Sequence, residues 1–474
     1  MISSLAGTIR KRRGEIIVCG YLILVLLFRL FPDSWNTSFL SGNQLKVSLL
    51  TVWTIAGWIS RGLSPAVVGL LNAVSLVFAE IITFTQGVHC LGNTTVVLVF
   101  SVLLLAASIR VSGIERRVSL WLLKIAGGHA EYTVLMVMFT LFLLTFFVPS
   151  AVGRVGILLP IASGLCREFN DENFSKMLMI GMTFGTLISS TSCITGASGV
   201  FYGVELFKEQ IGFEWTYLQW ARAYTPINLV STILIWYVLK RLFPPSSSCI
   251  SKGREFITAS YAKLGPMKRL EHKMVMVVIA MLVLWMTEPL HHFSVGLTAL
   301  TLSLCTVLPG IGIIDWDEAL KRINWSTLIL LASSVVMATA VSTSGLHLSL
   351  AEVLSGLLAG KSPATMALVI LVSVVLLRFG LNNITTINAV MLPITFAVAN
   401  STSTNPVWLG MVAMAAGKIG FYLPAQSVSA LATFSTGLYN SHDLMKAGAV
   451  VTPIVIVVIL LFSVFYWPTI GLAP

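Results

Sequence analysis

Two segments of this chain repeat each other, and they constrain its fold more than any other feature. Residues 143–161 (LLTFFVPSAVGRVGILLPI) align without a gap to residues 376–394 (LLRFGLNNITTINAVMLPI). The prolines Pro160 and Pro393 lie 233 positions apart in a chain of 474 residues. The repeat unit is therefore about half of the chain, and both copies interrupt an apolar stretch at the same place.

Each interruption predicts a helix break at membrane depth. Backbone at that depth leaves the helix only where protein or a water-filled cavity satisfies its polar groups. Two such breaks, one in each half, indicate a solute site at the interface of two repeats. The turn-forming patches are Pro149-Ser150 and Gly153-Arg154 in the first copy, and Asn382-Asn383 and Thr385-Thr386 in the second.

The composition places the chain in a lipid bilayer. Hydrophobic residues make up 56% of it and charged residues 10%, against about 25% charged residues in soluble domains. A spanning helix needs about 20 apolar residues, so we expect an all-α polytopic membrane protein with about 11 transmembrane helices and two re-entrant hairpins. The net charge of +11 lies in short loops between apolar runs, which follows the positive-inside rule and predicts no nucleic-acid partner.

Charge also predicts the organisation of the chain. Four basic residues, Arg10-Lys11-Arg12-Arg13, precede an apolar run without a small-residue cleavage site, so we expect a first spanning helix with a cytoplasmic N-terminus, in the bacterial inner membrane. An odd number of crossings on each side of a basic cytoplasmic linker gives the two repeats inverted topology. The expected parts are a tail with an extra helix (1–44), a first repeat (45–240) with an inner hairpin (131–167), the linker (241–273), and a second repeat (274–474) with an outer hairpin (363–400).

Several stretches are similar to a known family. They are residues 264–291, residues 308–325, the paired segments that end in LPI, and residues 442–454. Together they resemble the divalent-anion/sodium symporter family of the wider ion-transporter superfamily. The resemblance implies a homodimer in which a mobile transport domain moves against a scaffold, carrying dicarboxylates, citrate or sulfate by an elevator motion that is often coupled to sodium.

The tips depart from the family pattern. Family members carry Ser-Asn-Thr ten residues before each hairpin proline, where this chain has Ser150-Ala151-Val152 and Asn383-Ile384-Thr385. Of the six positions, Ser150 and Thr385 match the family residue types. Because the missing side chains help to hold sodium in the family, the departure favours exchange of one anion for another or coupling to protons.

The residue types at the breaks suit a small anion. A helix that starts at a tip offers unpaired N–H groups and a positive dipole end, which together cradle an anion. The carbonyl groups of the helix that ends there suit a hard cation, so sodium remains the candidate coupling ion if transport is ion-coupled, and we expect no other cofactor, no metal and no catalytic residue. The candidate substrate-binding residues are Ser150, Arg154, Ser190, Thr191, Asn382, Asn383, Thr385, Thr386 and Ser427, and the resemblance adds Ser150, Gly153, Asn383, Thr385 and Gln426 as candidate ion-binding residues.

Three charged residues inside apolar runs leave alternatives open. Arg154 either binds a substrate carboxylate with its planar fork or braces the tip by bonding backbone carbonyls; in the first case its replacement by alanine abolishes uptake. Arg378 either reaches the cavity or snorkels to the outer surface. Glu80, inside the third expected span, is either a proton carrier or a hydrogen-bonded helix contact.

These observations predict a secondary active transporter of a small divalent anion, working by elevator-type alternating access and either sodium-coupled or an exchanger. The sequence has no P-loop motif that would indicate ATP-driven transport. A cation/proton antiporter of the same superfamily is the main alternative, and it should carry Asp or Glu at the helix breaks. A membrane enzyme would need intramembrane carboxylate pairs, a histidine cluster or a metal motif.

Overall fold

The computed structural model describes residues 2–30, 40–60, 62–146, 148, 150–246, 250–358, 360–381 and 384–474. Throughout these ranges the chain folds into helices joined by turns, and no strand is present in them. The expected all-α polytopic membrane fold is therefore confirmed.

The helices of the first half of the chain lead up to the linker. They are α1 (Ile2–Leu30), α2 (Gly42–Ser60), α3 (Pro65–Phe78), α4 (Phe84–Leu91), α5 (Thr94–Ser112), α6 (Ile114–Ile125), α7 (Ala130–Leu144), α8 (Ala151–Phe169), α9 (Glu172–Ser189), the 3-10 turn η2 (Ile194–Gly196), α10 (Ser198–Ile211) and α11 (Tyr217–Leu242).

The second half begins within the linker, which itself contains a helix. The elements are α12 (Ile250–Ala262), α13 (Arg269–Met286), α14 (Glu288–His291), α15 (Val295–Cys305), α16 (Trp316–Arg322), α17 (Trp325–Thr343), α18 (Leu346–Leu358), α19 (Pro363–Leu377), α20 (Ile384–Ser401), α21 (Pro406–Ala416), η4 (Pro424–Gln426), α22 (Val428–Phe434), α23 (Ser441–Leu461), η5 (Phe462–Tyr466) and η6 (Trp467–Ile470).

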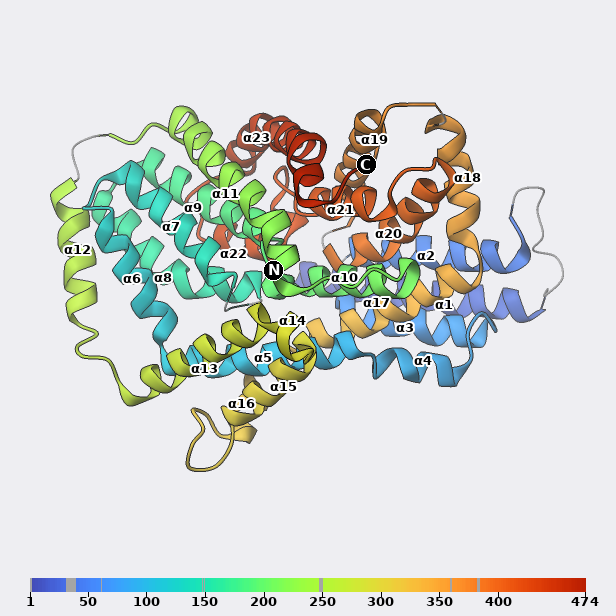
Figure 1. Cartoon of the computed structure of the whole chain (residues 1–474), viewed down its shortest axis with the longest axis horizontal. Helices are drawn as coiled ribbons and strands as arrows, with labels where there is room; N and C mark the ends of the chain where they lie inside the picture. The colour runs from blue at the N-terminus through green and yellow to red at the C-terminus, as the bar shows by residue number, and fades with distance from the viewer. Residues whose placement is uncertain are drawn as a thin grey trace.

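The helices gather into two groups. Helices α3 and α17 pack on each other, as do α5 and α15, and with α1, α2, α4, α13 and α16 we call this group the framework. The second group, α7–α11 with α19–α23, contains all the interrupted apolar stretches, and we call it the tip-bearing unit. Figure 1 shows α1–α4 gathered at one end of the molecule, with α10 and α20 between that end and the region of α6–α9.

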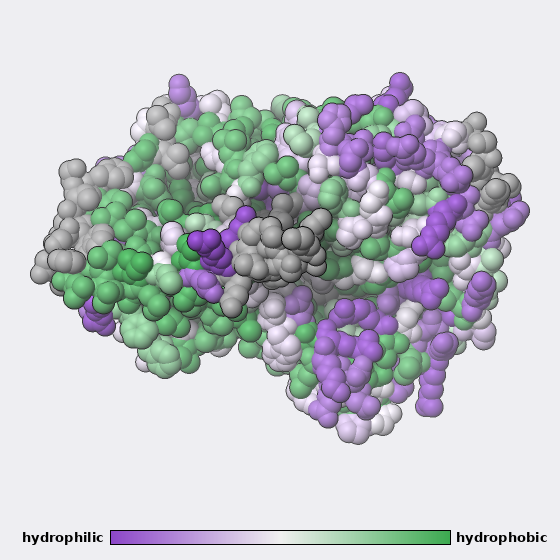
Figure 2. Space-filling view, turned by 180° about the vertical axis from the view of Figure 1, so that it is seen from behind, coloured by the Kyte–Doolittle hydropathy of each residue, from purple (hydrophilic) through white to green (hydrophobic). Residues whose placement is uncertain are grey.

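Apolar side chains cover much of the outer surface. Figure 2 shows a mostly hydrophobic surface over the end that carries α1–α4, whereas hydrophilic residues gather toward the other end. Exposed Leu22, Leu26, Val52 and Val74 belong to that apolar surface. Lipid is the environment in which such a surface is stable. Within the described ranges, four helical stretches are long and apolar enough to cross a membrane: Phe84–Ser112, Trp325–Thr343, Ile384–Ser401 and Ser441–Ile470.

The prediction that Glu80 lies inside a membrane span is wrong. Helix α3 ends at Phe78, and Glu80 lies beyond it with φ +60° in an exposed turn. Its carboxylate pairs with the Arg29 guanidinium at 2.5 Å. The apolar run is continuous in sequence, but Thr83 and Gln86 form a capping box that starts α4 and ends the expected span early.

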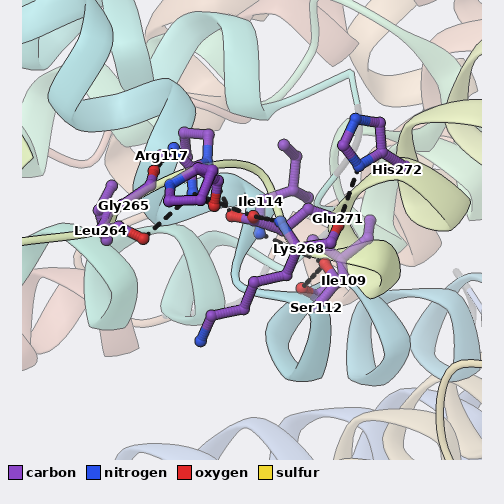
Figure 3. Close-up of polar contacts among 10 residues, drawn as sticks. Ile109, Ser112, Ile114, Arg117, Leu264, Gly265, Lys268, Glu271 and His272 are labelled. Atoms are coloured by element: carbon purple, nitrogen blue, oxygen red, sulfur yellow. Dashed lines mark hydrogen bonds and ion pairs between the residues drawn. The ribbon is translucent and has the colours of Figure 1, made fainter.

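One buried ion pair ties the linker to the short helix α6. The Arg117 Nε and Nη2 atoms donate to the Glu271 carboxylate at 2.8 and 3.0 Å, and the same guanidinium donates to the carbonyls of Gly265 and Pro266 at 2.9 and 3.1 Å (Figure 3). Glu271 also accepts the backbone N–H of Lys268, which caps α13. Arg117 thereby fixes the chain just before it enters the second half of the framework.

Replacing Arg117 by alanine should lower the melting temperature of the detergent-solubilised protein. The side chains of Arg117 and Glu271 are 12% and 5% exposed, and removing one partner of a buried pair costs about 3–5 kcal/mol. Arg117 holds the pKa of Glu271 below its ordinary value, so the pair stabilises the fold above the unfolded pKa of about 4.3 and is lost as pH falls below it.

Melting curves at pH 7 and at progressively lower pH check this. The exposed Arg116 is the matched control, and its alanine variant should melt like the wild type. The role of the pair would be contradicted if Arg117→Ala melted at the same temperature as Arg116→Ala at pH 7. It would also be contradicted if the difference between their melting temperatures grew as the pH was lowered.

Candidate functional site

Both predicted helix breaks are present. Tip 1, between α7 and α8, is non-helical after Leu144, and Ser150 caps the new helix by accepting the N–H of Gly153 at 3.1 Å. Tip 2 lies between the end of α19 at Leu377 and the start of α20 at Ile384. The candidate residues Asn382 and Asn383 fall outside the described residues.

Each tip is accompanied by a broken span. Break 1 separates the end of α9 at Ser189 from the start of α10 at Ser198, and break 2 separates the end of α21 at Ala416 from the start of α22 at Val428. Helix α20 packs against α10, and helix α8 packs against α22. Each tip helix therefore contacts the broken span of the other half of the chain.

Tip 2 fits against the start of α10 with little room to spare. A Cβ added to Gly199 would lie 2.7 Å from both Ile384 Cγ2 and the Thr385 backbone nitrogen. The Asn388 amide donates to the Gly199 carbonyl at 2.8 Å, and the Ser198 and Thr385 hydroxyls are 3.4 Å apart. Only a residue without a side chain allows this approach.

A cavity of about 300 Å³ lies where the tips, the breaks and the framework meet. Three predicted substrate-binding residues line it: Ser150 from tip 1, Ser190 from break 1 and Ser427 from break 2. Helices α8, α10 and α20 of the tip-bearing unit and α3 and α17 of the framework all have their first residues on its wall. Since helix starts carry positive dipole ends and free N–H groups, the cavity suits an anion. Its remaining polar lining is Ser198, Asn324, Ser326, Thr327, Arg378 and Ser429.

Arg154 lies outside this lining and bonds backbone instead. Its side chain is 0% exposed. The guanidinium donates to the carbonyls of Val148, Gly196 and Thr186 at 2.7, 2.9 and 3.3 Å. This is the bracing arrangement, in which one arginine donates to backbone carbonyls around tip 1 and break 1.

Among the other candidate residues, Gln426, Thr191 and Gly153 form hydrogen bonds within the protein. Gln426 Oε1 accepts the N–H groups of Tyr422 and Leu423, and its Nε2 donates to the Arg378 carbonyl at 3.2 Å. Thr191 accepts from the Asn228 amide at 3.0 Å, Gly153 donates to Ser150, and Thr386 is buried in α20 away from the cavity wall.

Two buried cations stand out in the tip-bearing unit. Arg378 is 1% exposed and lines the cavity, so the snorkelling alternative is wrong. Lys418, which sequence reasoning missed, is 0% exposed in break 2 and donates to Asn228 Oδ1. Each is the single charged residue of an apolar run, LLRFG or AMAAGKIGF. A lone basic residue in such a run is the sequence feature that could have identified Lys418 as a buried cation.

No described carboxylate lies within ion-pair distance of Arg154, Arg378 or Lys418. The acidic groups that do form pairs are at the ends of helices and in loops. The described interior of the tip-bearing unit therefore holds basic side chains without acidic partners, which favours anions in its cavity beyond what neutral hydroxyls alone would provide.

Replacing Gly199 by alanine should abolish most transport and lower thermal stability. The added methyl group meets backbone at tip 2, which cannot move aside as a flexible side chain can. Gly156→Ala in α8 is the control, because nothing lies within 4 Å of its added Cβ. Uptake into proteoliposomes and melting curves check both variants, and equal behaviour of the two would show that tip 2 does not depend on this contact.

Known proteins resemble the chain over most of its length. Residues 20–473 match the family described as the sodium:sulfate symporter transmembrane region. The chain is 26% identical over 400 residues to a citrate/succinate antiporter of Escherichia coli K12, covering 81% of this chain and 80% of that one. It is 23% identical over 392 residues to an L-tartrate/succinate antiporter of Shigella sonnei, covering 80% of each.

A solved structure has a related fold. The YdaH transporter of Alcanivorax borkumensis superposes with a TM-score of 0.50 and 12% sequence identity, covering 90% of this chain and 100% of that one. At that identity the likeness concerns the fold alone.

Proposed function

The chain belongs to the family of the sodium:sulfate symporter transmembrane region, and from this premise we propose that it exchanges one small di- or tricarboxylate for another. Members of this family and the matched relatives are anion transporters, so the protein is an integral membrane anion transporter and not an enzyme. The cation/proton antiporter alternative loses its support, because the cavity wall carries a cation and no acid in the part of the chain that is described.

The observation that carries the proposal is the set of buried basic side chains that have no acidic partner among the described residues. Arg154, Arg378 and Lys418 all lie inside the tip-bearing unit. Each ionised side chain at the centre of a bilayer costs about 2.5–3.5 kcal/mol by insertion scales. A bound dianion offsets this charge, whereas an empty site leaves it unbalanced. The loaded carrier then crosses more readily than the empty one, which is the condition for exchange.

The tips also support exchange over sodium coupling. A sodium ion would need carbonyl and hydroxyl oxygens, and here the guanidinium of Arg154 takes three of the carbonyls around tip 1 and break 1. At tip 1, the Ser150 hydroxyl already accepts the N–H of Gly153. In break 2, the amide oxygen of Gln426 accepts two backbone N–H groups. The named activities of the relatives, citrate/succinate and L-tartrate/succinate antiport, agree with this choice.

The position of the cavity supports alternating access. One wall belongs to the tip-bearing unit through Ser150, Ser190 and Ser427, and the other belongs to the framework through α3, α5 and α17. Movement of one group of helices past the other, in the elevator manner, would carry the site across the bilayer with re-entrant hairpins at its tips. The proposal includes a homodimer in the bacterial inner membrane with a cytoplasmic N-terminus, which the basic residues before α1's apolar part support.

Counterflow in proteoliposomes tests the proposal. Vesicles loaded with unlabelled succinate should accumulate external labelled citrate or succinate. Vesicles without an internal anion should accumulate at least about tenfold less, since returning the empty carrier exposes unbalanced charge to the bilayer. Replacing sodium by choline should leave the exchange unchanged. Strong uptake into anion-free vesicles that follows a sodium gradient would instead establish symport.

A further inference from the structure

Arg378 differs from the other buried arginines in what its guanidinium contacts. Arg154 and Arg117 donate to carbonyls and to a carboxylate, as described above. The Nε, Nη1 and Nη2 atoms of Arg378, by contrast, have no hydrogen-bond partner among the residues that the structure describes, although the side chain is 1% exposed. Buried donors of this kind are strongly destabilising unless something pairs with them. Because Arg378 lines the cavity, its donors are open to a ligand that enters the cavity.

Break 2 holds Arg378 in place. A Cβ on Gly420 would lie 2.2 Å from Nη2 and 2.9 Å from Cζ, so the guanidinium lies directly against the Gly420 backbone. The Arg378 carbonyl accepts from Gln426 Nε2 at 3.2 Å, and the Phe379 and Tyr422 rings lie 5.2 Å apart. A guanidinium positioned in this way loses little conformational freedom when a ligand binds.

We propose that Arg378 binds one carboxylate of the substrate, and that the start of α8 at Ser150 binds another. The planar guanidinium fork matches a carboxylate bidentately. The α8 start offers backbone N–H groups and a positive dipole end on the same cavity wall. Arg378 belongs to tip 2 and Ser150 to tip 1, so a substrate with two separated carboxylates uses both subsites, whereas a single-centred anion such as sulfate uses one.

This inference rests on the proposed anion transport and names the substrate class. It also suggests a role for the hydroxyls of Ser198 and Ser429, which line the cavity. They suit hydrogen bonds with hydroxyl or carbonyl groups between the two carboxylates of a substrate. Selectivity for linear dicarboxylates then depends on Arg378 as well as on the polar residues that follow it in tip 2.

Binding to the full-length protein in detergent tests it, by isothermal titration calorimetry with three ligands. Succinate has two carboxylates, succinamate has one carboxylate and a neutral amide of the same shape, and sulfate has one centre. The wild type should prefer succinate over succinamate by about tenfold to a hundredfold, the usual effect of one charge-assisted pair. In Arg378→Gln this preference should fall to about threefold or less, while sulfate binding changes little.

Gly420→Ala keeps the charge but displaces the guanidinium, and it should lose the same preference. Arg378→Lys, which keeps the charge without the fork, should fall between the wild type and Arg378→Gln, and Arg116→Gln on the surface is the control. If Arg378→Gln does not fold, Gly420→Ala and Arg378→Lys decide the question.

A succinate preference that persists in these variants would overturn the role of Arg378 and leave anion exchange standing. A wild type that binds neither succinate nor sulfate would contradict the proposed function, and the inference with it.

Discussion

Positive charge buried in a lipid-embedded interior is the constraint on which the rest of this structure depends. A guanidinium or ammonium group in such a place must be paired, bonded to backbone or matched by a ligand. Arg117 is paired with Glu271 near the linker, and Arg154 is bonded to three carbonyls. Arg378 has no such partner within the described chain, and it lies on the wall of a cavity into which several helix starts point. This contrast separates the arginines that support the fold from the one that we propose binds an anion.

The crossed packing of the two halves explains how one cavity comes to have walls from all the interrupted stretches. Helix α20 lies on α10 and helix α8 lies on α22, so each tip is held by the broken span of the other half. Gly199 allows the closest of these approaches, and Asn388 fastens it. These contacts stay inside the tip-bearing unit, which suits the proposed movement of that unit as one body, and the framework helices α3, α5 and α17 present it with a separate wall.

The sequence predicted the architecture better than the details of the site. Helix breaks were predictable at tip 1, tip 2 and both broken spans, because turn-forming and polar residues interrupt apolar runs there. The hydrogen bonds of Arg154 were not predictable from the sequence, because they depend on the Thr186 and Gly196 carbonyls, which only the fold brings close to it. Ser198, Ser429 and Thr327 line the cavity through tertiary packing alone. Glu80 was misplaced because a capping box ended its helix early.

The central claim is that unbalanced buried charge ties the return of the carrier to a bound anion, and Lys418 allows the most direct test of it. Lys418→Met keeps the volume and removes one buried charge, so net uptake of labelled succinate into anion-free vesicles should rise several-fold over the wild type while counterflow persists. The exposed Lys361→Met is the matched control and should behave like the wild type. Net uptake by Lys418→Met that stays at the wild-type level, with counterflow intact, would contradict the account.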